Sequence, residues 1–135
     1  MENFRTFDSG ATRDAADGKL EYGNYIHPLN DYSFANYMKW KQIIGGEYRR
    51  GDNWQKGIPD ESLFDSLIRH IEILKLLRKG HKVIEIKVKG KIDLIIDWEA
   101  PENAEVFEKN IIDELNAIRF NSEALKLFYL TQNNV

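Results

Sequence analysis

Residues 60–98 read DESLFDSLIRHIEILKLLRKGHKVIEIKVKGKIDLIIDW, and a change of period inside this stretch decides the fold. Up to Gly80 the pattern is helical, with one stripe made of Leu63, Leu67, His70, Leu74 and Leu77. Asp60 is a good N-cap and Gly80 a good terminator, so 60–79 is predicted to be an amphipathic helix. After Gly80 the residues alternate with a period of two. This alternation predicts a β-hairpin over about 82–98 that turns at Lys89-Gly90.

Two further helices are predicted on either side of this stretch. The first covers about 30–44, where apolar residues fall loosely on helical spacing and Gly45-Gly46 ends the pattern. The second covers about 101–130, because Pro101 and the glutamates after it suit a first turn. Residues 1–30 are predicted to form an ordered polar loop segment, and 47–59 a polar loop.

These elements predict a mainly α fold, a helical bundle with an inserted β-hairpin. Two long helices, 60–79 and 101–130, are expected to pack antiparallel. Their shared core is expected to contain Leu67, Leu74, Leu115 and Ile118. A lone hairpin and helices that are apolar on more than one side leave surface to cover, so we expect a homodimer or higher homo-oligomer.

The overall composition limits the classes to which this protein can belong. A chain of 135 residues that is 42% hydrophobic and 30% charged fits one globular domain over 1–135. The net charge of −3 gives no reason to expect a nucleic-acid partner. The absence of cysteine excludes a disulfide framework and a thiolate zinc site. With no apolar run near the roughly 18 residues of a membrane span, we expect a cytoplasmic protein with no membrane partner.

The first polar motif is RTFDSGATRD at residues 5–14, followed by Gly18-Lys19. Arg5, Arg13 and Lys19 supply cationic donors beside glycines, a combination that phosphate oxygens require. The alternative is a solvated loop whose charges have no specific partner. The motif is therefore a candidate phosphate-binding loop.

The second polar motif is DNWQKGIP at residues 52–59. Trp54 offers a face for stacking, Asn53 can bond to the edge of a base, and Lys56 is a mobile cation. Alternatively, Trp54 plugs the core beneath the loop and Asn53 caps a turn. This motif is a candidate base-binding loop.

Two helical positions complete the candidate site. Arg69 and His70 are adjacent in the helix 60–79, and His70 lies on its apolar stripe, where a satisfied core histidine is the usual explanation. Asp113, Glu114 and Asn121 lie on the last predicted helix. A carboxylate there is a metal ligand, a partner for Arg69, or part of the solvated side of the helix.

The motifs occur together in an order that resembles a known family. They are RxFxxGAxRDxxxGKxxY at 5–22, DNWQKGIP at 52–59, SLxRH at 66–70 and AIxFN at 117–121. The series resembles the phage and bacterial dATP/dGTP diphosphohydrolase N-terminal domain family, which belongs with the MazG-like nucleotide pyrophosphohydrolases. The resemblance covers roughly residues 4–80 and 110–130. It implies an all-helical nucleotide pocket, often completed by dimerisation, with Mg²⁺ held by carboxylates of facing helices.

The chain departs from that pattern at the metal ligands. Where the family tends to carry acids, this chain has Asn36 and Ile73, which leaves Asp113 and Glu114 as candidate metal ligands. The leading hypothesis is therefore a protein that binds and sequesters a purine nucleotide, or a nucleotide-derived signal of host defence, without cleaving it. It would need no cofactor for binding.

Two other functions remain open at this point. The first is a Mg²⁺-dependent dATP/dGTP pyrophosphohydrolase whose missing acids come from Glu21, Glu47 or a second subunit. The second is a partner-binding role with the hairpin as the docking edge.

Overall fold

The structure is a computed structural model that describes residues 8–10, 22–44, 47–48 and 57–132. The chain divides into two compact units, Met1–Asp31 and Tyr32–Val135. The described part of the first unit contains the short helix α1 (Tyr22–Tyr25) and the start of α2 (Pro28–Lys41). That one domain covers residues 1–135 stays a prediction.

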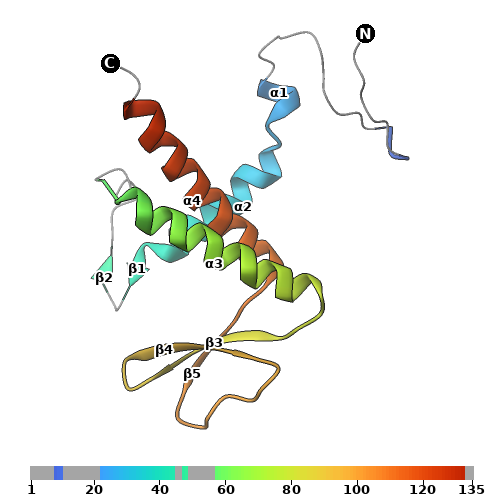
Figure 1. Cartoon of the computed structure of the whole chain (residues 1–135). Coiled ribbons are helices and arrows are strands. Elements are labelled where there is room, and N and C mark those ends of the chain that lie inside the picture. The colour runs from blue at the N-terminus through green and yellow to red at the C-terminus, as the bar shows by residue number, and fades with distance from the viewer. Residues whose placement is uncertain (1–7, 11–21, 45–46, 49–56, 133–135) are drawn as a thin grey trace. The chain divides into compact units, whose positions relative to one another are not determined.

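Two long helices, α3 (Asp60–Arg78) and α4 (Ile111–Gln132), form the centre of the second unit (Figure 1). They run antiparallel, because Asp60 at the start of α3 contacts Tyr129 near the end of α4. The predicted helix over 60–79 is confirmed. Its N-cap is Pro59, which makes no side-chain capping bond, so Asp60 lies in the first turn instead of capping it. No helix in the described part of the chain has the length and apolarity needed to cross a membrane.

A three-stranded antiparallel sheet follows α3, in the order β4-β3-β5. Its strands are β3 (Val83–Val88), β4 (Lys91–Ile96) and β5 (Glu105–Glu108). The predicted hairpin over 82–98 is present as β3 and β4, joined at Lys89-Gly90. Both turn residues have positive φ, 50° and 81°, as a two-residue type I′ turn requires. A separate two-stranded pair consists of β1 (Ile43–Ile44) and β2 (Glu47–Tyr48).

The predicted mainly α class is wrong, since the chain is a mixed α/β protein. The hairpin occupies one edge of β3, and residues 105–108 pair with the other edge, with Phe107 opposite Glu85. The segment 101–110 therefore does not join the last helix, which begins only at Ile111. Pairing with an open strand edge prevails here over a local sequence that suits a helical first turn. The first predicted helix is also displaced, because α2 ends at Lys41 and β1 follows.

The core differs from the predicted apolar stripe. Leu115 is 46% exposed, while Leu67, Leu74 and Ile118 are only half-buried, so the predicted four-residue core is wrong. Instead α4 turns its small and polar face inward, burying Ala117, Ala124, Glu114 and Asn121. Alanine side chains let two helix backbones approach closely, which explains why this face contacts α3. The buried apolar residues of α3 are Leu63 and Ile73, and those of the sheet are Val83 and Ile84.

Candidate functional site

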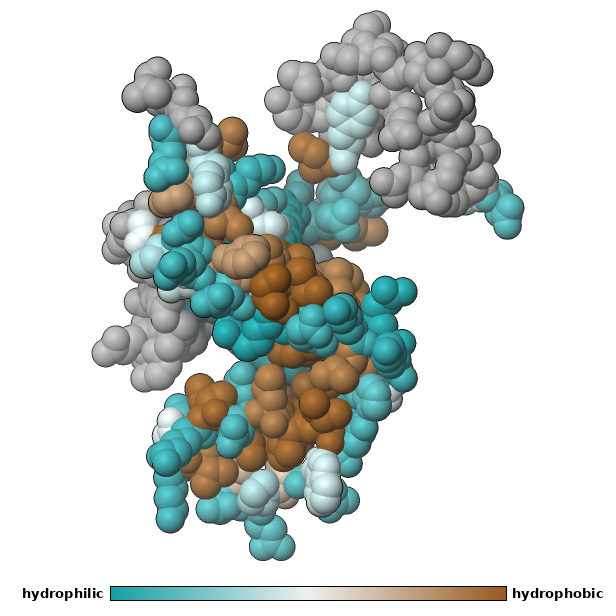
Figure 2. Space-filling view, in the orientation of Figure 1, coloured by the Kyte–Doolittle hydropathy of each residue, from teal (hydrophilic) through white to brown (hydrophobic). Residues whose placement is uncertain are grey.

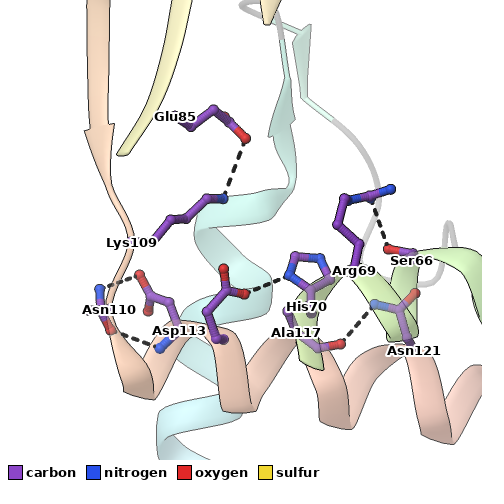
Figure 3. Close-up of polar contacts among 10 residues, drawn as sticks. Ser66, Arg69, His70, Glu85, Lys109, Asn110, Asp113, Ala117 and Asn121 are labelled. Atoms are coloured by element: carbon purple, nitrogen blue, oxygen red, sulfur yellow. Dashed lines mark hydrogen bonds and ion pairs between the residues drawn. The ribbon is translucent and has the colours of Figure 1, made fainter. Parts of the chain in front are cut away.

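A buried carboxylate and a histidine meet where α3 faces α4. Nδ1 of His70 lies 2.6 Å from Oε2 of Glu114, and the Glu114 residue is only 2% exposed (Figure 3). The His70 side chain is 16% exposed. Both residues come from the helical faces that pack together, so the contact is part of the helix interface. The structure therefore brings together two of the predicted site residues, and the partner of Glu114 is His70.

The second carboxylate oxygen of Glu114 is buried and unsatisfied. Among the described residues, Oε1 has no hydrogen-bond partner. A buried charged oxygen without a donor costs free energy, and such groups are rare in proteins unless they serve a purpose. Glu114 Oε1 is thus an open acceptor inside the protein.

Helix α2 contributes a further polar face to this region. The Asn116 side chain donates a hydrogen bond of 3.0 Å to Oγ of Ser33. Burial, followed by the charges of Glu114 and then Asp113, raises the pKa of Tyr37 to about 12. The charges of two carboxylates therefore favour the neutral Tyr37 hydroxyl, and α2 adds polar side chains next to the contact between α3 and α4.

Asp113, the other predicted metal ligand, lies in the first turn of α4, which Asn110 caps. Oδ1 of Asn110 accepts a hydrogen bond of 2.8 Å from the Asp113 backbone N–H, and Oδ2 of Asp113 accepts one of 2.9 Å from the Asn110 amide (Figure 3). This reciprocal pair satisfies a free donor at the start of α4. Asp113 is exposed whereas Glu114 is buried, and each carboxylate has a different partner.

The described residues do not fit a magnesium site at these two acids. Mg²⁺ needs several oxygen ligands in an octahedral arrangement. No group of three or more His, Cys, Asp or Glu side chains in the described ranges is placed to hold a metal ion. Of the two family positions, Ile73 lies in the core and Asn36 is exposed.

The remaining described candidates make local contacts. Arg69 is exposed and donates to Oγ of Ser66 at 3.2 Å, one turn earlier on α3. Asn121 is buried, and its amide donates to the carbonyl of Ala117 at 2.8 Å. Six further predicted site residues lie outside the described residues: Arg5, Arg13, Lys19, Asn53, Trp54 and Lys56. Their convergence with Arg69 stays a prediction.

A cavity of about 530 Å³ lies at the opposite end of the helix pair. It is lined by Asp60, Glu61, Phe64, Asp65, Leu125 and Tyr129. Three carboxylates at its wall repel an anionic ligand. The acidic wall of this cavity is therefore unfavourable for nucleotide phosphates.

Comparison with known proteins leaves the family open. Neither a protein-family model, nor a curated protein, nor a solved structure matches this chain.

Sequence reasoning did not find several members of the cluster. Asn110 and Asp113 have the spacing of a capping box, which is a signal that the sequence does contain. Tyr37, Ser33 and Asn116 carry no such signal. Ser33 contacts Asn116, and Tyr37 comes under the charge of Glu114, because α2 approaches α4 in the folded chain.

Proposed function

We propose that this protein binds a purine nucleotide, or a signal molecule derived from one, and holds it without cleaving it. It would act in the cytoplasm of a bacterial host cell, as a sponge for a signal of host defence. One observation carries the proposal: Glu114 is buried against His70 with a second carboxylate oxygen that has no partner. The family resemblance of the Arg69-His70 motif and the AIxFN motif supports the choice of a nucleotide.

The chemistry of the pair suits a base with exposed N–H donors. When Glu114 is ionised, the proton of the contact resides on Nδ1 of His70, so the imidazole has a fixed orientation and Nε2 is left for a ligand. Oε1 of Glu114 is an acceptor for the exocyclic amine of adenine, or for the exocyclic amine and ring N1–H of guanine. A base that donates to Oε1 would satisfy this buried side-chain acceptor, which has no partner among the described residues.

Access is part of the proposal. Oε1 is fully shielded, so a ligand reaches it only after a neighbouring side chain moves aside. The His70 side chain is 16% exposed, so a ligand would approach the pair past the exposed edge of His70. The Arg69 guanidinium donates a hydrogen bond to the Ser66 hydroxyl, and it can exchange that bond for one to a phosphate.

Binding without hydrolysis is favoured by the state of the acids. Hydrolysis by two metals needs carboxylates that converge on bridging ions. Here Glu114 bonds to His70, Asp113 bonds to Asn110, and Ile73 occupies a core position. Tight binding of a substrate does not speed its chemistry unless the transition state is bound better. The protein would therefore retain its ligand.

The test is a panel of nucleotides on the pure full-length chain. The panel contains ATP, dATP, GTP, dGTP and their cyclic mono- and dinucleotides, each with and without Mg²⁺. Calorimetry measures binding, and chromatography of the same samples measures intact ligand and pyrophosphate. We expect at least one purine compound to bind with no pyrophosphate released. Binding of none of them overturns the proposal, and release at about 1 s⁻¹ or faster, an ordinary enzymatic rate, favours the pyrophosphohydrolase instead.

A matched pair of histidine variants locates the ligand. His70→Gln keeps a polar side chain but loses the contact to Glu114, and is expected to weaken binding at least tenfold. His81→Gln is the control, because His81 contacts Asp97 in an exposed position away from the helix interface. Equal affinity of the two variants would show that the ligand does not use the Glu114 cluster.

A further inference from the structure

Strand β4 is an unprotected edge of the sheet. In the order β4-β3-β5 it pairs only with β3, so its outer backbone groups are open within the described sheet. Its exposed apolar side chains are Ile92 (62%), Leu94 (39%) and Ile96 (38%). Figure 2 shows hydrophobic side chains gathered over the strands on one face. Natural edges of this kind are usually shortened, charged or covered, because an open apolar edge pairs with another chain.

The hairpin geometry identifies which backbone groups face outward. In a two-residue type I′ hairpin the residues that flank the turn, Val88 and Lys91, form a hydrogen-bonded pair. Hydrogen-bonded and non-hydrogen-bonded pairs alternate along an antiparallel ladder. Ile92, Leu94 and Ile96 therefore direct their N–H and C=O groups away from β3. The residues with free backbone groups are the same three that carry exposed apolar side chains on one face.

The other edge of the sheet is built differently. β5 has only four residues, and it begins at Glu105 and ends at Glu108. Very short edge strands and charged residues on the edge are two of the devices by which proteins protect a sheet edge from pairing. β5 is thus a protected edge, and β4 is the one open to a partner.

We propose that β4 pairs antiparallel with β4 of a second copy of this chain, with Leu94 opposite Leu94 on the two-fold axis. Ile92 of each copy then lies opposite Ile96 of the other, and the two sheets join into one of six strands. This inference is independent of the proposed nucleotide function. It names the contact through which the expected homo-oligomer forms.

Charge selects this register. With Leu94 on the axis, Lys91 of one copy comes near Asp97 of the other, the residue that directly follows β4, so opposite charges meet at the ends of the paired strands. A shift of two residues in one direction places Asp93 opposite Asp93, and in the other direction it places Asp93 opposite Asp97. Both shifts bring like charges together, and opposite-charge pairs are favoured across strands. A shift of the pairing by one residue is excluded. It would place a residue whose backbone N–H and C=O point toward the partner strand opposite one whose groups point back toward β3.

Cysteine cross-linking tests the register on a chain that has no cysteine of its own. Hydrogen-bonded partners have Cα atoms about 5.5 Å apart, within the range of a disulfide. Leu94→Cys should therefore form a covalent dimer under mild oxidation. Ile92→Cys is the matched control, because its copies would be about 13 Å apart, four residues along the strand. A mixture of Ile92→Cys and Ile96→Cys chains should cross-link to each other.

Sedimentation equilibrium tests the edge itself. The parent chain should sediment at twice its mass of 15.8 kDa at concentrations of tens of micromolar. Leu94→Lys places two ammonium groups on the axis and should give a folded monomer. Phe107→Lys, an exposed position on β5, should remain dimeric. A monomeric parent, a dimeric Leu94→Lys variant, or equal cross-linking at positions 92 and 94 would each overturn the proposal.

Discussion

Nδ1 of His70 lies 2.6 Å from Oε2 of Glu114, in a contact that joins α3 to α4 across the buried helix interface. The carboxylate is taken out of water, and His70 is the one partner that compensates it among the described residues. A buried pair of this kind adds little net stability. Removal of one partner is nevertheless strongly destabilising, because the other group is then buried without compensation.

Replacing His70 with Ala should lower the free energy of unfolding by about 3 kcal/mol, because Glu114 is then buried with both oxygens unpartnered. Urea denaturation followed by circular dichroism measures this difference. The matched control is Lys75→Ala, which breaks an exposed 3.0 Å ion pair with Glu72 on the same helix. The control should cost about 0–1 kcal/mol.

The double substitution His70→Leu with Glu114→Leu separates this charge effect from loss of packing. Removing both partners leaves no unpaired charge, so the double variant should be more stable than His70→Ala. A double variant as unstable as the single one would show that the His70–Glu114 contact is not the origin of the loss.

Tyr37 should ionise late in a spectrophotometric titration of the six tyrosines. Its pKa is raised from 10.0 to about 12, so the folded state binds the phenolic proton more tightly than the unfolded state does. The resulting stability is fully present below pH 10 and is lost as the pH rises from 10 to 12. Tyr37→Phe should remove the late step and flatten the loss of stability over that range. Tyr32→Phe, at an exposed position of α2, is the control and should leave both unchanged.

Asn110→Ala should destabilise the chain by about 1 kcal/mol, because it removes the side chain that caps the start of α4. Thermal unfolding by circular dichroism measures the effect. Ser122→Ala, which removes a hydroxyl bond to the Arg119 carbonyl within the same helix, should stay within about 0.5 kcal/mol of the parent. If the two variants are equally stable, Asn110 does not act as a cap.

Asp97 should make the sheet sensitive to acid. Hydrogen bonds from His81 and from the Lys82 backbone lower its pKa below the ordinary value of 3.8. The stability that these bonds contribute is present above pH 3.8 and is lost as the pH falls through the lowered pKa. Asp97→Asn should reduce the difference in stability between pH 6 and pH 2.5, whereas Asp93→Asn on β4 should not. An unchanged pH profile for Asp97→Asn would contradict this assignment.

Part of the candidate site follows from sequence. The stripe on residues 60–79 includes His70, and the last predicted helix includes Glu114 and Asn121, which are both buried in the structure. From the sequence, either Arg69 or a metal ion was a possible partner for the Glu114 carboxylate. The structure pairs it with His70, because His70 lies on the packed side of α3 while the neighbouring Arg69 is exposed.

The sequence by itself determined the elements whose signals are local: helix α3, from its period and its glycine stop, and the hairpin of β3 and β4, from its alternation and its Lys89-Gly90 turn. Tertiary structure decided the rest. Residues 105–108 become a strand because β3 has a second open edge. The hydrophobic pattern of one segment does not show which strand edges elsewhere in the fold are unpaired. Likewise, α4 buries Ala117 and Glu114 and leaves Leu115 exposed. The physical reason is that close helix approach depends on the size of side chains on both partners, whereas a hydrophobic stripe describes only one.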